Sequence, residues 1–316
     1  MSLTDKPRAV AADAAVRGRN PASVDRPEWP RDFVWAMIVL VACFGVPLFH
    51  LVWFAATSEM YSHILLVPLV SGYLAWMRRR NVPAVSKPNR LATAVAGCAG
   101  LVLLAGYWLA VWRGWPMSDQ DGLAWTTAAF VCLVFAVCGF FAGRETLRTM
   151  RFPLWFLIFM VPFPTLLHNW LENVLQQGSA LTAYALFEMS GTPVFYNNLN
   201  FQLPGFALQV APVCSGIRSS LVLFLTSLVA GHLFLRSPWK RGILAVAVLP
   251  LGLLRNGFRI FVIGQLCVHI GPQMIHSAIH RDGGPVFFAL SMVPFFLLLI
   301  LLRRSERVPS ALRPAP

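Results

Sequence analysis

Long apolar blocks separated by short basic segments constrain this chain more than any other feature. Blocks such as 91–112, 123–142 and 285–302 are almost free of charged residues, and each is long enough to cross the roughly 30 Å hydrocarbon core of a bilayer. The 316-residue chain is 57% apolar and 12% charged, whereas soluble domains carry about 25% charged residues. This pattern excludes a soluble globular protein and predicts an integral membrane protein.

The apolar blocks predict an all-α, polytopic membrane protein with about eight transmembrane helices. The second predicted span is short, and Pro162 and Pro164 break the fifth, so other groups must satisfy the freed backbone there. Residues 242–270 are long for one span, and we expect that region to tilt or to break near Gly257. The predicted spans are 34–54, 63–77, 91–112, 123–142, 152–167, 217–235, 242–262 and 285–302.

The polar ends of the chain set its expected domain limits. The N-terminal segment 1–33 has no hydrophobic periodicity and is typical of a disordered tail rather than of a signal peptide. We therefore expect a disordered cytoplasmic tail at 1–33, one transmembrane domain at 34–302 and a cytoplasmic C-terminal tail at 303–316.

The basic residues predict the orientation of the chain. Lys and Arg gather in alternate loops, whereas the intervening stretches 55–62 and 168–216 contain none. By the positive-inside rule, both termini and the basic loops are expected in the cytoplasm. The net charge of +13 is therefore interpreted as a signal for insertion into the lipid bilayer, with no nucleic-acid partner. The basic loop residues are Arg78, Arg79, Arg80, Lys87, Arg90, Arg144, Arg148, Arg151, Arg236, Lys240, Arg241, Arg303, Arg304 and Arg307.

The stretch 168–216, expected on the outer face, divides into two parts. Its first part has a helical period with one apolar face, which indicates an interfacial helix. In 191–213, Gly, Pro and Asn punctuate short apolar runs, which indicates an irregular outer segment of extended structure and turns. This segment leads to Cys214, and we expect it to shape an outer pocket.

Among the six cysteines, Cys214 has the surroundings of a reactive residue. The others lie in apolar stretches, where a free cysteine is usually a small hydrophobic residue. Cys214 lies beside Ser215 and Gly216 at the expected start of a helix, where free N–H groups and the helix dipole favour a thiolate. These neighbours outweigh the alternative that Cys214 only packs.

Two arginines and two histidines are candidates to act with Cys214. Arg255 and Arg259 share a helix face, and a membrane-embedded arginine usually faces protein or a watery cavity. They could snorkel to the interface, but no acidic residue in that span pairs with them, so an oxyanion or carboxylate ligand is a reasonable partner. Arg218 could serve the same site. His276 and His280 are expected in the next outer loop, and composition alone chooses neither histidine.

Three motifs follow one another along the chain. They are Cys-Ser-Gly-x-Arg at Cys214, Ser215, Gly216 and Arg218, Asn-x-x-Arg at Asn256 and Arg259, and His-x-x-x-Gly with a later Phe at His280, Gly284 and Phe288. In this order the motifs resemble the exosortase/archaeosortase family of membrane cysteine transpeptidases. An outer turn at Tyr61-Ser62-His63 also resembles that family, and the agreement covers roughly residues 35–302.

The resemblance implies a bacterial inner-membrane enzyme that cleaves C-terminal sorting signals of exported proteins at the outer face. Such a signal comprises a recognition motif, one transmembrane helix and a basic tail. By motif offsets, the resemblance implies Cys214 as the nucleophile, Arg259 rather than Arg255 as the oxyanion stabiliser, and His280 rather than His276 as the acid–base group. It implies a thioester intermediate that is resolved by water, an amine or a lipid-linked acceptor.

No metal site or cofactor is expected, because no cluster of His, Cys, Asp and Glu has ligand spacing and no phosphate loop is present. Two alternatives remain open. One is a non-enzymatic transporter or a component of envelope or exopolysaccharide assembly, although no internal repeat is visible. The other is a thiol–quinone redox protein, which would need a second outer cysteine.

Overall fold

The computed structural model describes residues 31–58, 60–79, 88–211, 215–276 and 283–306. Contacts divide the chain into two compact units. The first unit is 1–46, 67–109 and 128–158, and the second is 47–66, 110–127 and 159–316. Each unit is described by itself below.

The described residues are mainly helical, as predicted. Among the described residues, the first helix begins at Arg31 and the last ends at Arg304. The helices are α2 (Arg31–Cys43), α3 (Gly45–Thr57), η1 (Ser62–Leu65), α4 (Leu66–Arg78), α5 (Arg90–Trp112), α6 (Asp119–Val137), the π-helix η3 (Cys138–Ala142), α7 (Gly143–Thr149), α8 (Arg151–Phe156), η4 (Leu157–Met160), α9 (Thr165–Met189), α10 (Ile217–Phe234), α11 (Pro238–His269), η6 (Pro272–His276) and α13 (Gly284–Arg304).

Five of the described helices are long and apolar enough to cross a membrane, or up to seven spans exist if two bent helix pairs count as one span each. The predicted number of eight is therefore not confirmed. The predicted span 63–77 corresponds to α4, which has only 13 residues. The predicted span 34–54 is the bent pair α2 and α3, at 67°. The proline break in the fifth span is confirmed, because the helix Arg151–Met160 meets α9 at 90°. The expected interfacial helix is thus part of α9.

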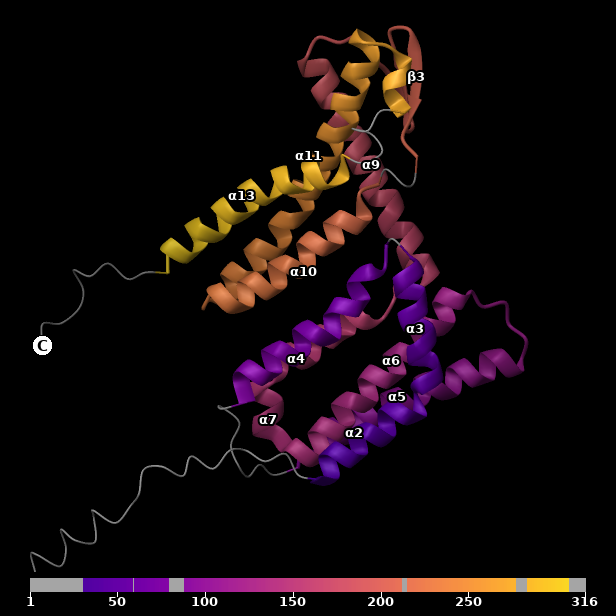
Figure 1. The fold of residues 1–316 in the computed structure, drawn as a ribbon, viewed down its shortest axis with the longest axis vertical. Coiled ribbons are helices and arrows are strands. Elements are labelled where there is room, and N and C mark those ends of the chain that lie inside the picture. The colour runs from indigo at the N-terminus through magenta and orange to yellow at the C-terminus, as the bar shows by residue number, and fades with distance from the viewer. Residues whose placement is uncertain (1–30, 59, 80–87, 212–214, 277–282, 307–316) are drawn as a thin grey trace, which may run out of the picture. The chain divides into compact units, whose positions relative to one another are not determined.

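In the first unit, α5 packs closely against the end of α6 (Figure 1). A Cβ atom on Gly100 would lie 2.9 Å from Cγ of Leu133, and one on Gly139 would lie 2.8 Å from Oγ1 of Thr93. Small residues at such positions let membrane helices approach closely. The rings of Phe44 and Phe130 also pack together in this unit, with centroids 5.5 Å apart.

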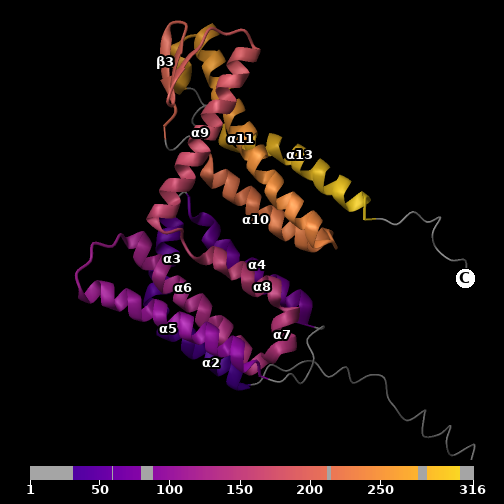
Figure 2. The same ribbon diagram turned by 180° about the vertical axis from the view of Figure 1, so that it is seen from behind.

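In the second unit, α11 is the central helix and contacts α9, α10, α13 and η6. Both views of the ribbon show α10 and α13 along its first part and the strands near its end (Figures 1 and 2). Of the two expectations for residues 242–270, the break near Gly257 is wrong, since α11 is one helix of 32 residues, and the tilt of this helix stays a prediction. Gly257 instead allows close packing, because a Cβ atom there would lie 2.6 Å from Cβ of Thr182 on α9.

The segment 191–213 contains a three-stranded antiparallel sheet, which confirms the prediction of extended structure and turns. Its strands are β1 (Phe195–Asn197), β2 (Asn200–Leu203) and β3 (Phe206–Gln209), paired in that order. The β1–β2 connection places Asn198 and Leu199 at positive φ, as a two-residue type I′ turn requires. A leucine is unusual there, but Leu199 packs against the core cluster that holds Phe201 of β2 and Phe187 of α9.

Glu306 ties the end of α13 to the turn before α11. Its carboxylate accepts hydrogen bonds from the backbone N–H groups of Arg236, at 2.9 Å, and of Ser237, at 2.8 Å. These two hydrogen bonds lower the pKa of the Glu306 carboxyl. The link fixes the spacing of α10, α11 and α13 at the end that loop charges assign to the cytoplasm.

Candidate active site

The turn that precedes α10 carries the described end of the Cys-Ser-Gly-x-Arg motif. Cys214 itself lies outside the described residues. Ser215 is only 2% exposed, and Gly216 has φ of 70°, in the left-handed region. The carbonyl oxygen of Gly216 accepts the backbone N–H of Ser220 at 3.0 Å and so starts the helix.

Arg255 of α11 binds this turn directly. Its Nη2 donates to the carbonyl oxygen of Gly216 and to the Oγ of Ser220, both at 3.2 Å. Arg255 is 8% exposed, and its Nη1 has no hydrogen-bond partner among the described residues. The guanidinium of Arg255 is therefore held by its Nη2 against the chain two residues after Cys214. Its Nη1 makes no hydrogen bond to the described residues.

Gly216 is the residue that permits this approach. A Cβ atom at Gly216 would lie 3.1 Å from Nη2 of Arg255 and 3.0 Å from Cγ of Asn256. The positive φ also disfavours any residue with a side chain. The glycine of the first motif and the asparagine of the second motif are therefore in contact, although 40 positions separate them in the sequence.

The other cationic candidates lie close by along the same two helices. Arg259 is one turn beyond Arg255 on α11 and is partly buried. Arg218 lies in the first turn of α10 and is exposed. The structure thus brings the Arg255–Arg259 face of α11 to the turn that follows Cys214. Of the two arginines, Arg255 makes the hydrogen bond to Gly216, although the motif offsets favour Arg259.

The histidine segment begins beside the same helix. His276 is the last residue of η6, and its side chain lies outside the described residues, as does the whole of His280. Ile275 packs against the core cluster that contains Ile260, the residue after Arg259. The chain that leads to both histidines therefore begins at the core cluster that contains Ile260, next to Arg259. The choice of His280 over His276 as the acid–base group stays a prediction.

A buried hydrogen bond fixes the chain on the N-terminal side of Cys214, at Val210. Val210, just after β3, is anchored because Nε2 of Gln176 on α9 donates to its carbonyl oxygen at 2.6 Å. Its N–H also bonds the carbonyl oxygen of Leu199 at 2.9 Å. Val210 and Gly216 are thus both held, one against α9 and the other against α11, on either side of Cys214. No motif or spacing in the sequence indicates this role of Gln176.

A second polar network, also missed from the sequence, holds the turn at Tyr61. Nε2 of Gln120 donates to the Tyr61 hydroxyl at 2.9 Å and to the carbonyl oxygen of Phe163 at 2.6 Å. The neighbouring Asp121 accepts the N–H of Thr165 at 2.7 Å, where α9 begins. Burial, together with the nearby carboxylates of Asp121 and Glu172, raises the pKa of Tyr61 to about 12. Tyr61 therefore stays a neutral hydroxyl, and Gln120 links it to the proline break at Phe163.

The site holds a buried cation, Arg255, against the turn that follows Cys214, and such an arrangement is suited to stabilising an anion. Hydrogen-bond donors held in a water-poor site stabilise an oxyanion without reorganising. Among the described residues, no three His, Cys, Asp or Glu side chains gather as metal ligands.

Comparison with known families places residues 53–297 in a family of membrane proteins. The model of the transmembrane exosortase family (Exosortase_EpsH) matches residues 53–297, a range that contains Cys214, Arg255, Arg259, His276 and His280. No curated protein and no solved structure matches the chain.

Proposed function

Because the chain belongs to the transmembrane exosortase family, we propose that it is a membrane cysteine transpeptidase that cleaves C-terminal sorting signals of exported proteins. Membership supports a transpeptidase-type role in the membrane in general. The sorting-signal substrate, the thioester intermediate and the roles of the individual residues go beyond family membership, and we propose them here. Its expected partners are proteins that carry a motif, a transmembrane helix and a basic tail.

The observation that carries this proposal is the contact between Arg255 and the turn after Cys214. Nη2 of Arg255 lies 3.2 Å from the carbonyl oxygen of Gly216, and Asn256 packs on the same glycine. Two sequence motifs therefore meet at the turn after Cys214, which supports a shared site for the proposed nucleophile and oxyanion donor. A packed structural cysteine needs neither a buried arginine nor a left-handed glycine beside it.

The reaction follows from the roles of these groups. The Cys214 thiolate attacks the substrate carbonyl carbon, and Arg259 stabilises the resulting oxyanion, with Nη1 of Arg255 as a further donor. The C–N bond then breaks, and His280, which accepted the thiol proton of Cys214 before the attack, delivers it to the leaving amine. An acceptor amine or water, which gives its proton to His280, attacks the thioester carbonyl and releases Cys214 as thiolate. Transfer and hydrolysis differ only in this acceptor.

The depth of the site supports processing near a membrane surface. Arg255 follows Pro238, the first residue of α11, by 17 positions, which is about 26 Å along the helix. That distance is close to the roughly 30 Å thickness of the hydrocarbon core. With the basic start of α11 in the cytoplasm, the site lies near the outer, periplasmic interface of a bacterial inner membrane. A sorting signal would place its motif there, with its basic tail inside.

Processing of a co-expressed substrate tests the proposal. A protein with a C-terminal motif, helix and basic tail should lose its C-terminus with the wild-type enzyme and keep it with Cys214→Ala. The matched control is Cys98→Ala, because Cys98 is an exposed free cysteine on α5. Full processing by Cys214→Ala would remove the nucleophile assignment. An active His280→Ala beside an inactive His276→Ala would reverse the histidine choice.

The alternative of a non-enzymatic transporter or assembly component makes a different prediction. Such a protein would move or bind its ligand without a covalent adduct, and Cys214→Ala would change it little. The buried hydrogen bonds that fix both flanks of Cys214 favour the enzyme, because binding alone does not require the backbone beside one cysteine to be held.

A further inference from the structure

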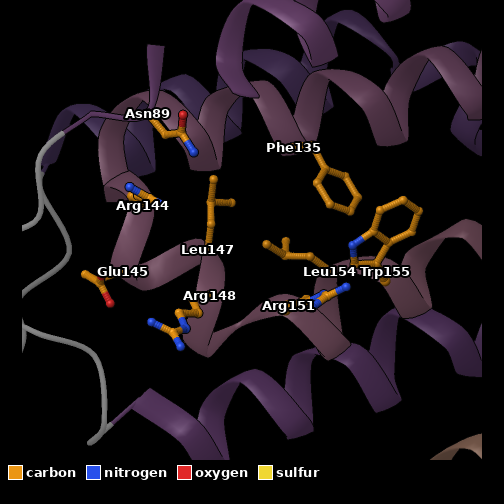
Figure 3. Close-up of a pocket in the computed structure, with 9 residues that line it drawn as sticks. All are labelled: Asn89, Phe135, Arg144, Glu145, Leu147, Arg148, Arg151, Leu154 and Trp155. Carbon is orange, nitrogen blue, oxygen red and sulfur yellow. The ribbon is translucent and has the colours of Figure 1, made fainter. Parts of the chain in front are cut away.

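A cavity of about 650 Å³ lies within the first unit, and none of its lining residues belongs to the candidate active site. It is formed by the end of α6, by α7 and α8, and by the residue before α5. Its lining, drawn in Figure 3, is Asn89, Phe135, Arg144, Glu145, Leu147, Arg148, Arg151, Leu154 and Trp155.

The lining carries a surplus of positive charge. Three arginines meet one carboxylate, Glu145. Arg144 and Arg148 are one turn apart on α7, and Arg151 lies at the start of α8. All three are at least partly exposed. A basic peptide, such as the tail expected of a sorting signal, would be repelled here, whereas an anion would be attracted.

The backbone that presents these arginines is fixed rather than loose. Between α7 and α8, the N–H of Met150 bonds the carbonyl oxygen of Thr146 at 2.8 Å. Nη1 of Arg78 on α4 donates to the carbonyl oxygen of Thr149 at 3.2 Å. The turn before Arg151 is therefore held from two sides, so the backbone that carries these arginines is fixed beside α4.

The opposite wall of the cavity is apolar and aromatic. The rings of Phe135 and Trp155 meet edge to face, with centroids 5.6 Å apart, and Leu147 and Leu154 complete the wall (Figure 3). Trp155 remains 56% exposed. A tryptophan beside arginines at the end of a membrane helix is typical of the interface, where head groups meet acyl chains.

We propose that this cavity binds a phosphate ester, with the phosphate among Arg144, Arg148 and Arg151 and the apolar part of the ligand against Trp155. Arginine suits this role because its planar fork can donate two parallel hydrogen bonds to a phosphate. Basic pockets between membrane helices on the cytoplasmic side accept anionic head groups in this way, and the loop charges predict that α7 and α8 lie on that side.

Two sources could supply the phosphate ester, and the lining distinguishes them. A soluble glycerol phosphate would use only the arginines. An anionic phospholipid such as phosphatidylglycerol would use the arginines and also cover the wall of Phe135, Leu154 and Trp155 with its glycerol and first acyl carbons. The wall therefore favours the lipid. This site does not depend on the proposed peptidase activity.

Native mass spectrometry of the purified full chain in a neutral detergent tests this proposal. Didecanoyl phosphatidylglycerol, didecanoyl phosphatidylcholine and glycerol 3-phosphate are titrated separately, and the bound fraction is measured. We expect phosphatidylglycerol to bind more tightly than phosphatidylcholine. The loss of each arginine should weaken that binding about fivefold, the usual contribution of one basic residue near an anionic surface.

Matched variants separate this site from general charge effects. Arg148→Gln and the triple Arg144, Arg148 and Arg151→Gln variant should weaken binding. Arg304→Gln should not, because it removes an exposed arginine in the last turn of α13, outside the cavity. The corresponding triple lysine variant keeps the charge that directs insertion but loses the planar fork. It should therefore insert normally and still bind more weakly.

Each outcome decides the question. Arginine-dependent phosphatidylglycerol binding without competition from glycerol 3-phosphate supports the lipid. Arginine-dependent binding of glycerol 3-phosphate supports a soluble ester instead. If the triple glutamine variant binds phosphatidylglycerol as the wild type and Arg304→Gln do, the proposal is overturned, and these arginines serve only to orient the chain.

Discussion

Gly216→Ala perturbs the contact on which the active-site account depends. The substitution places a Cβ atom 3.1 Å from Nη2 of Arg255 and 3.0 Å from Cγ of Asn256. It also puts a side chain at φ of 70°, which costs about 1–2 kcal/mol for a residue other than glycine. The guanidinium must then move away from the carbonyl oxygen of residue 216.

The expected effect on activity follows from the lost hydrogen bond. A hydrogen bond to a charged group contributes about 1.5–3 kcal/mol, and each step of about 1.36 kcal/mol corresponds to a tenfold change in rate. If the Arg255 contact holds the catalytic turn in place, processing per folded molecule should fall about 10- to 150-fold.

Gly114→Ala is the matched control, because Gly114 has φ of 66° and a Cβ atom added there would meet no other atom within 4 Å. Both variants carry the same kind of backbone strain, and only Gly216→Ala carries the collision. The assay is the rate of C-terminal processing of a sorting-signal substrate, normalised to the amount of folded enzyme found by thermal unfolding. Equal normalised rates for the two variants would refute the role given to the Arg255 contact.

Three further perturbations test other parts of the account. Arg255→Lys keeps the charge but loses the planar fork, so processing should fall while Cys214 remains in place; wild-type processing would show that the geometry of the fork is not needed. Gln176→Leu leaves the buried carbonyl of Val210 without its donor and should lower the free energy of unfolding by about 1–3 kcal/mol. Thermal unfolding in detergent measures this change, and an unchanged midpoint would contradict the anchoring role of Gln176. The pKa of Glu306 is lowered on folding, so its contribution to stability is present above the unfolded-state pKa and is lost as the pH falls through the folded-state pKa. Unfolding midpoints followed from about pH 7 to about pH 3 should therefore decline more steeply for the wild type than for Glu306→Gln. Parallel curves would contradict the link between Glu306 and the turn before α11.

Much of the fold could be predicted because the signals are local. Apolar blocks predict the helices, Pro162 and Pro164 mark the break before α9, and the Gly, Pro and Asn pattern of 191–213 predicts the strands. The bend between α2 and α3 was missed, although Pro47 in the first turn of α3 is close to a position that proline favours. The apolar pattern of the predicted span 34–54 continues through the bend between α2 and α3, so hydropathy alone does not reveal the bend.

The missed features of the site depend on packing that no single segment encodes. Helical periodicity places Arg255 and Arg259 on one face, but the partner of each is set by how closely α10 meets α11. Gly257 was interpreted as a weak point, whereas the absence of a side chain there allows α9 to approach. Gln176 resembles an ordinary polar residue of an amphipathic helix, and only the fold shows that it donates to the carbonyl of Val210.

Detection of a covalent intermediate on Cys214 tests the central claim most directly. The enzyme is co-expressed with a sorting-signal protein and quenched with acid, and the peptide that contains Cys214 is weighed by mass spectrometry. We expect a peptide that carries the mass of the cleaved substrate, bound as a thioester that neutral hydroxylamine releases, and its absence in Cys214→Ala. Processing of the substrate by Cys214→Ala at the wild-type rate, with no adduct on the wild-type enzyme, would contradict the claim.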